Sequence, residues 1–297
     1  MPDAVRDWVV QVSGSPVVAV EEQTGGMSPG CATRLRFADG SRAFVKAVGT
    51  SLNPGTPLLF RREREVLERI GPDPTWAALL ASYDDGDWVA LLLEDVEGTE
   101  PDLSDDDLLA RVCQETDRLS ERLADVPVAA GLTREITALL DNWAVGFDHV
   151  EDIDPTLRPE WLTDQVDRWR GVLEGFRDQP VGLVHSDVRS DNLLVRPTGE
   201  LVFVDWGMAL HGPAWFDPLL VRLERVDDPW FDASISTSPG LVAAGDEAIT
   251  AWLVGCATWL AWRTESIDDV NLPTMRAFRI QESQRMFAGA ARRLGLG

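Results

Sequence analysis

The feature that most constrains the fold is an abrupt change of pattern near residues 95–103. Before it, the chain has strand-like apolar or alternating runs at 17–22, 31–37, 42–48 and 88–94, with one helical pattern at 58–70. After it, helical periodicity dominates. A run of strands followed by a run of helices is typical of α+β proteins. We therefore expect a β-rich domain over residues 1–95 and a helical domain over residues 96–297.

The second part has one compact β element within its helices. Helices are predicted at 104–123, 133–150, 161–177, 219–225, 241–264 and 273–294. Short strands are predicted at 181–185, 193–195 and 201–204, and a loop at 226–239. The nearly uncharged run 249–262 is too short to cross a bilayer, so it predicts a buried core helix.

The charge balance is strongly acidic, with 50 acidic and 27 basic residues and a net charge of −23. Such a field repels nucleic acid and anionic membranes and attracts a cationic ligand. A composition that only keeps the protein in solution explains the charge equally well. The N-terminus shows no secretory signal, and the three cysteines lack metal-ligand spacing, so a reducing cytoplasm is expected.

The basic residues include only one lysine, Lys46, among 27 lysines and arginines. A lysine that persists in an arginine-rich chain is a candidate for chemistry that needs a compact point charge instead of a planar guanidinium. Chance survival is the alternative.

The most specific motif is a histidine, an aspartate and an asparagine in one short stretch. His185, Asp187 and Asn192 follow the pattern H-x-D-x4-N, and Asp205-Trp206-Gly207 begins thirteen residues after Asn192. Asp187 follows a predicted buried strand, where it could orient a substrate hydroxyl or accept its proton. Asn192 and Asp205 flank a predicted tight hairpin and could converge on one metal ion, which prefers such oxygen ligands. Turn and capping chemistry is the alternative for all three residues.

These motifs resemble the catalytic loop and metal-binding aspartate of protein-kinase-like phosphotransferases, and most closely those of the aminoglycoside phosphotransferase family. The resemblance implies a bilobal protein-kinase-like fold with a small β-rich lobe and a larger helical lobe. It implies ATP and Mg²⁺ as cofactors and transfer of the γ-phosphate to a small-molecule hydroxyl. Asp187 would be catalytic, and Asn192 and Asp205 would bind the metal.

The resemblance extends to the first lobe. Lys46 stands where the family places the lysine that holds the α- and β-phosphates. Glu63 stands where the family has the glutamate that pairs with this lysine, and Glu65 is the fallback.

Two further segments match nucleotide-binding positions of the family. Gly25 and Gly26 lie in a loop that would cover the phosphates, although its glycine spacing and Pro29 depart from the protein-kinase pattern. Glu94 and Val96 match the hinge whose backbone meets adenine.

Three further residues lie in or near the predicted catalytic loop. Arg189 is at a position that contacts the γ-phosphate in protein kinases, and a solvent-facing arginine is the alternative. We expect His185 to hold the loop by hydrogen bonds and Asp217 to support it from the next helix.

The short interval between Asp205-Trp206-Gly207 and the next predicted helix near Pro218 leaves no room for a long activation segment. This favours a small-molecule kinase over a protein kinase. A nucleotide-binding pseudokinase or regulatory module is the alternative, although a pure binder has no need of Asp187.

The acceptor is not identified by the sequence. The resemblance and the acidic surplus make an aminoglycoside or another amine-bearing alcohol an option. Asp227, Asp228 and Asp232 could bind ammonium groups, and solvated loop acids are the alternative.

Overall fold

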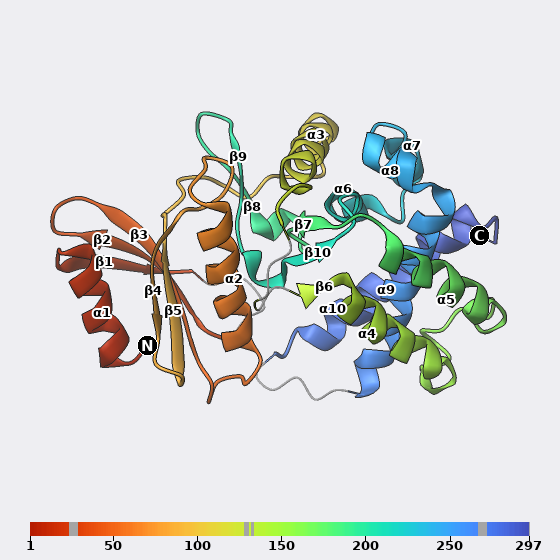
Figure 1. Cartoon of the computed structure of the whole chain (residues 1–297), viewed down its shortest axis with the longest axis horizontal. Helices are drawn as coiled ribbons and strands as arrows, with labels where there is room; N and C mark the ends of the chain where they lie inside the picture. The colour runs from red at the N-terminus through yellow and green to blue at the C-terminus, as the bar shows by residue number, and fades with distance from the viewer. Residues whose placement is uncertain (24–28, 128–130, 132–133, 267–271, 297) are drawn as a thin grey trace.

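The structure is a computed structural model that describes residues 1–23, 29–127, 131, 134–266 and 272–296. Figure 1 shows a β-sheet with two helices at the N-terminal end of the molecule and a larger group of helices at the other end. The predicted α+β class, with a smaller β-rich part and a larger helical part, is confirmed. The boundary predicted between residues 95 and 96 stays a prediction.

The first part is built on a five-stranded sheet with the order β1-β2-β3-β5-β4, antiparallel throughout. Its strands are β1 (Val17–Glu22), β2 (Cys31–Phe37), β3 (Arg42–Gly49), β4 (Leu79–Asp84) and β5 (Trp88–Leu93). In the centre of the sheet, Lys46 of β3 lies opposite Ala32 of β2 and Leu91 of β5. Side chains alternate between the two faces of a strand, so residues 44, 46 and 48 share one face and residues 43, 45 and 47 the other.

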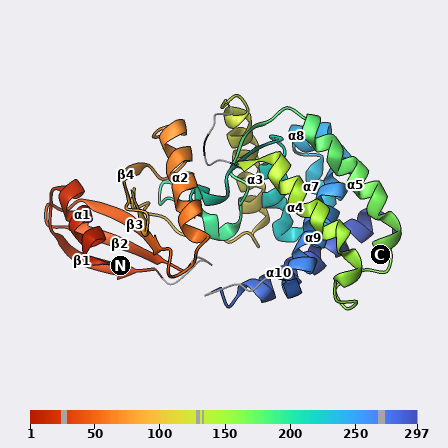
Figure 2. The same cartoon turned by 60° about the horizontal axis from the view of Figure 1, so that its bottom comes forward.

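Each face of this sheet is covered by a helix. The α1 helix (Asp3–Ser13) buries Val5 and Val9 against the face that carries Val45. The α2 helix (Thr56–Ile70) packs on the face that carries Leu91, and it ends at Gly71, whose N–H donates to the Leu67 carbonyl. Figure 2 shows α1 and α2 on opposite sides of the strands.

The prediction of a single helix in the first hundred residues was wrong. The α1 helix has no side-chain cap at its N-terminus, so the usual start signal was missing. Its C-terminal signal was present, because Gly14 has a φ of 67° and its N–H donates to Val10. The β4 strand was also not predicted.

The second part is mainly helical. Its α-helices are α3 (Asp106–Leu123), α4 (Ile136–Asp148), α5 (Val166–Glu174), α6 (Phe216–Arg222), α7 (Pro229–Ile235), α8 (Pro239–Ala244), α9 (Asp246–Ser266) and α10 (Met275–Arg293). Its 3-10 helices are η1 (Val150–Asp152), η2 (Thr163–Gln165), η3 (Gly175–Asp178), η4 (Ser190–Asn192), η5 (Trp206–Met208) and η6 (Leu223–Arg225). The segment predicted as a loop at 226–239 contains α7, which begins with the N-cap Asp228 and Pro229 in its first turn.

The helical part buries its own core around α9. Trp252, Val254 and Ala257 of this helix are buried in a cluster to which α4, α5 and α10 also contribute. The predicted core helix is thereby confirmed. Among the described helices, none has both the length and the apolar character needed to cross a membrane.

Two small β elements carry the polar motif residues. The strands β6 (Arg134–Glu135), β10 (Leu210–Gly212) and β7 (Gly182–Val184) form one sheet in that order, and β8 (Leu193–Val195) pairs with β9 (Leu201–Phe203). Both lie between the five-stranded sheet and the helices (Figure 1). The motif residues 185–192 and 205–207 are thus placed between the two parts of the molecule.

Candidate active site

The loop that follows β7 is anchored by hydrogen bonds to the side chain of Asp217. This aspartate lies in α6 and is fully buried. Its carboxylate accepts the backbone N–H groups of His185 at 2.7 Å and Ser186 at 2.8 Å. Hydrogen bonds from two consecutive N–H groups fix the path of the chain just before Asp187.

The backbone is strained on both sides of the site. Ser186 and Asp205 have φ values of 63° and 65°, and they are the non-glycine residues with positive φ in the described part of the chain. Such conformations persist only where the surrounding structure enforces them, and they cluster at functional sites. The buried His185 joins the two loops, because its Nε2 lies 2.9 Å from the carbonyl oxygen of Val204.

Asp187 and Asn192 are in direct contact. The Asn192 side-chain amide donates to the Asp187 carboxylate and to its backbone carbonyl, each at 2.9 Å. Burial raises the pKa of Asp187 to about 6, against the opposing effect of the nearby Arg189 guanidinium. The carboxylate is therefore poised to accept a proton near neutral pH.

Arg189 lies between acidic groups instead of facing solvent alone. Its Nη2 is 2.7 Å from Asp191 Oδ2, and its Nε is 3.6 Å from Asp187 Oδ1. Its guanidinium also stacks over the ring of Phe278 in α10, 5.3 Å from the ring centroid. The sequence did not point to Phe278, because this contact joins segments about ninety residues apart.

Lys46 connects the sheet, the α2 helix and the second loop. Its Nζ is 2.8 Å from Glu63 Oε2 and 3.1 Å from Asp205 Oδ1, and its side chain is 12 % exposed. Burial alone would lower the pKa of Lys46, but the carboxylates of Asp205 and Glu63 outweigh burial and raise it. The fallback partner Glu65 instead pairs with Arg69. The structure thus brings Lys46, Glu63 and Asp205 together as the sequence predicted for one site.

Two arginines that the sequence analysis did not select hold the segment after Asp205. Arg62 of α2 is 4 % exposed, and its Nη1 donates to the Gly207 carbonyl at 2.8 Å. Arg134 of β6 donates to the next carbonyl, that of Met208, at 3.1 Å. No local pattern identifies such contacts, since Arg62 and Gly207 are 145 residues apart.

The predicted hinge follows β5. The Glu94 carboxylate is 2.6 Å from Nη2 of Arg196. The backbone N–H of Glu94 donates to the Ala78 carbonyl. Val96 is buried. Gly25 and Gly26, predicted to cover the phosphates, lie outside the described residues.

The oxygen atoms available near Asp205 suit a hard divalent cation. Asn192 uses its amide nitrogen for both contacts with Asp187, and no hydrogen bond among the described residues uses its Oδ1. The Asp205 side chain is 41 % exposed. Mg²⁺ commonly takes one or two protein oxygens and completes its shell with phosphates and water, so this pair fits it. Over the described residues, no cluster of three or more His, Cys, Asp or Glu side chains forms a separate metal site.

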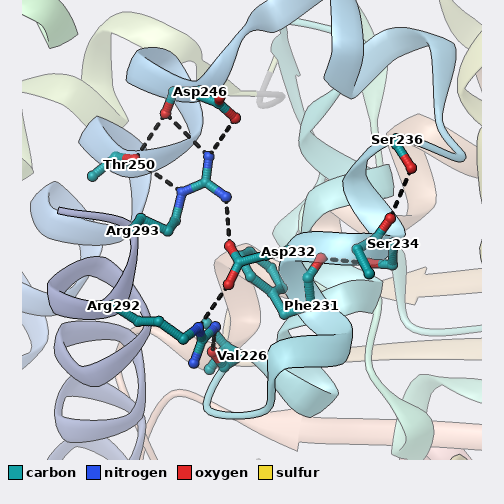
Figure 3. Close-up of polar contacts among 10 residues, drawn as sticks. Val226, Phe231, Asp232, Ser234, Ser236, Asp246, Thr250, Arg292 and Arg293 are labelled. Atoms are coloured by element: carbon teal, nitrogen blue, oxygen red, sulfur yellow. Dashed lines mark hydrogen bonds and ion pairs between the residues drawn. The ribbon is translucent and has the colours of Figure 1, made fainter. Parts of the chain in front are cut away.

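The acidic residues of 226–239 are engaged within the protein. Asp232 lies 2.6 Å from Arg292 Nε and 2.7 Å from Arg293 Nη1 (Figure 3). Asp228 caps α7 by accepting the Trp230 N–H, and Asp227 is 3.3 Å from Arg285. The sequence analysis considered these aspartates as ammonium ligands or as solvated loop acids, and neither interpretation included these internal contacts.

The Phosphotransferase enzyme family matches residues 33–250 of this chain. No curated protein sequence matches the chain.

Solved structures with the same fold cover nearly all of the chain. An aminoglycoside phosphotransferase from Alicyclobacillus acidocaldarius is 15 % identical with a TM-score of 0.58, over 100 % of this chain and 96 % of that one. Choline kinase LicA from Streptococcus pneumoniae is 16 % identical with a TM-score of 0.61, over 98 % of each chain. Amicoumacin kinase hAmiN, in complex with AMP-PNP, Ca²⁺ and Ami, is 13 % identical with a TM-score of 0.56, over 96 % of each chain. At these identities the similarity shows the fold alone, and it confirms the predicted protein-kinase-like fold.

Proposed function

Because the chain belongs to the phosphotransferase enzyme family, we propose that it transfers the γ-phosphate of ATP to a hydroxyl group of a small molecule. The observation that carries the proposal is the contact of one lysine with two carboxylates, those of Glu63 in α2 and Asp205 in the loop after β9. Lys46 contacts both Glu63 and Asp205. In the loop after β7, the Asn192 amide donates a hydrogen bond to the Asp187 carboxylate. Phosphoryl transfer depends mostly on such positioning and charge neutralisation.

Each residue has a defined role in this proposal. Asp187 orients the acceptor hydroxyl and takes its proton, and its pKa of about 6 leaves it ionised at neutral pH. Lys46, kept charged by Glu63 and Asp205, holds the α- and β-phosphates. Arg189 lies 3.6 Å from Asp187 and pairs with Asp191. On release from Asp191, its guanidinium would stabilise the negative charge of the transferred phosphoryl group.

Asn192 and Asp205 would hold Mg²⁺, which supplies neutralisation of the phosphate charges when bound. A nucleotide and a divalent cation are both present in the complex of the amicoumacin kinase. Glu94 and Val96 would meet the base through their backbone atoms, and Gly25 and Gly26 would cover the phosphates. Residues 1–95 would form the nucleotide-binding lobe, and residues 96–297 the lobe that binds the acceptor.

We propose a cationic acceptor on the basis of a hollow beside the catalytic loop. This hollow of about 530 Å³ is lined by residues that include Glu100, Asp102, Ser190 and Glu224. Glu224 also accepts the Ser190 N–H, which places it against the catalytic loop. Carboxylates outnumber the single Arg225 there, so an amine-bearing alcohol fits better than an anionic one. The free thiols of all three cysteines fit a cytoplasmic location.

The test is a coupled ADP-release assay with Mg²⁺-ATP and a panel of aminoglycosides, amino-sugars, choline and homoserine. We expect acceptor-dependent ADP release that falls by about a hundredfold or more in Asp187→Asn, with ATP affinity nearly unchanged. The exposed Asp178→Asn is the matched control. Unchanged turnover in Asp187→Asn would contradict the role of this aspartate.

Measurable ATP binding with no stimulation of ADP release by any acceptor, and with equal behaviour of Asp187→Asn and the native protein, would contradict the proposed transfer.

A further inference from the structure

The hinge is tied to the sheet by an aspartate that two arginines share. Asp95 lies between Glu94 and Val96, and its side chain is 2 % exposed. Arg34 of β2 places Nη1 2.8 Å from Asp95 Oδ1, and Arg42 of β3 places Nη2 2.7 Å from Asp95 Oδ2. Neither β4 nor the helical part supplies these contacts, so the two arginines join the hinge directly to the two strands.

Arg34 reaches the hinge from the face of the sheet that carries Lys46. It lies opposite Phe44 in the β2–β3 register, and Phe44 lies opposite Leu93 at the end of β5. Phe44 and Lys46 are two residues apart and so point to the same face. The guanidinium of Arg34 is therefore on the side where the proposed function places the nucleotide.

Arg34 makes one contact that Arg42 does not make. Its Nη1 also donates to the backbone carbonyl of Val96 at 3.3 Å. Within the described part of the chain, no hydrogen bond uses the Val96 N–H. The Val96 N–H is thus a donor without a partner among the described residues, while the Val96 carbonyl already accepts a hydrogen bond from a cation.

This asymmetry discriminates between the two purine bases. The Watson–Crick edge of adenine has a donor at its 6-amino group and an acceptor at N1, whereas that of guanine has an acceptor at O6 and donors at N1 and at its 2-amino group. The free Val96 N–H suits N1 of adenine. Guanine would need the Val96 carbonyl for its donors, and there its N–H groups would face the Arg34 guanidinium, which offers only further donors. A site built to hydrogen-bond one partner rejects an analogue whose polar groups stay unpaired.

We infer that Arg34 makes the nucleotide site selective for adenine over guanine by placing a cationic donor at the Val96 carbonyl. The inference rests on the proposed function, since it takes residues 94–96 as the segment that meets the base. It assigns a specificity role to a residue outside the phosphate-binding and catalytic groups.

The chain offers a matched pair of variants. Arg34→Met removes the contact with the Val96 carbonyl but leaves Asp95 paired with Arg42, so no buried carboxylate is left without a partner. Arg42→Met removes one arginine from the same aspartate but keeps the contact between Arg34 and Val96. Both variants lose one ion pair of Asp95, and only the first frees the carbonyl.

The experiment is calorimetric titration of the whole chain with MgADP and MgGDP, which needs no acceptor. We expect the native protein to prefer ADP, and Arg34→Met to reduce the ratio of the two affinities by about tenfold through tighter GDP binding. Arg42→Met should keep the native ratio within about twofold.

Three results would overturn the inference: a native protein that binds GDP as well as ADP, an Arg34→Met protein with the native ratio, or an equal shift in Arg42→Met. The first of these needs no variant. In each case ADP binding and acceptor-dependent turnover would still stand, so the proposed function survives. Absence of binding by either nucleotide would remove both.

Discussion

Lys46 Nζ lies 3.1 Å from Asp205 Oδ1, so the only lysine of the chain is in contact with the aspartate proposed to hold the metal. The same Nζ contacts Glu63 of α2. The ammonium group therefore links the sheet, a helix and the loop after β9. A nucleotide with its metal ion would enter beside a lysine whose position is already fixed by two carboxylates.

This geometry predicts that Lys46→Arg is not a conservative change. A planar guanidinium is larger than an ammonium group and cannot reproduce two short contacts that converge on one atom in a nearly buried position. We expect kcat/KM for ATP to fall by at least about tenfold. Steady-state ADP release measures it, and Arg64→Lys on the same α2 helix as Glu63 serves as the control. Native activity in Lys46→Arg would mean that the lysine survives by chance.

The pH dependence of turnover should report Asp187. Its pKa is raised to about 6, so the carboxylate required for transfer is lost as the pH falls through this value. The positive charge of Arg189 opposes that rise. Arg189→Met removes the charge and should move the acidic limb of the kcat profile to higher pH, by roughly one pH unit.

The measurement is kcat from pH 5 to 8 at saturating ATP and acceptor, with the distant Arg170→Met as control. A role for Arg189 limited to the γ-phosphate would lower kcat equally at every pH. An unshifted acidic limb would therefore contradict the proposed coupling between Arg189 and Asp187.

The parts of the site that were predictable from sequence are local. Asp187 and Asn192 lie on one loop and contact each other, and Asp205 follows the adjoining β8–β9 hairpin, so local signals in the chain place all three. The pairing of Lys46 with Glu63, and not with Glu65, was predicted from the match to the family motif. The geometry of an α-helix agrees, because two residues along it turn the side chain to nearly the opposite side.

The parts that were missed depend on tertiary contacts or on signals that were read incompletely. Arg62 is a charged residue on a helix rich in charge, and only the folded chain shows that it is buried against Gly207. The α7 helix did carry a start signal, Asp228 followed by Pro229, within the segment predicted as a loop. The glycine pair Gly25 and Gly26 remains a prediction.

Arg62 should affect metal binding without touching the metal. Its bond to the Gly207 carbonyl fixes the segment that begins with Asp205. Removing a buried charged donor leaves that carbonyl unsatisfied and costs about 2 kcal/mol. We expect Arg62→Met to raise the Mg²⁺ concentration for half-maximal activity by about fivefold or more, and Arg62→Lys to restore part of the loss.

A titration of activity with Mg²⁺ at fixed ATP gives this value, and Arg64→Met on the same helix is the matched control. If Arg62→Met lowered only the thermal stability and left the Mg²⁺ dependence unchanged, the contact would be structural and not a means of positioning Asp205.

Asp232 is predicted to stabilise the fold instead of binding the acceptor. Its carboxylate joins Arg292 and Arg293 near the C-terminal end of α10, and Arg293 also reaches Thr250 and Asp246 of α9 (Figure 3). The Arg293 side chain is 7 % exposed, so loss of Asp232 leaves a nearly buried cation with fewer partners. We expect Asp232→Ala to lower the free energy of unfolding by about 2 kcal/mol, measured by urea denaturation.

The helix cap provides the comparison for this change. Asp228→Ala removes one hydrogen bond to the Trp230 N–H and should cost about 1 kcal/mol, less than Asp232→Ala. Neither change should alter the KM of the acceptor, because both carboxylates are engaged within the protein. A raised KM in Asp232→Ala with unchanged stability would mean that this carboxylate leaves its arginines to bind the acceptor. The loop would then contribute to the acceptor site as the sequence first allowed.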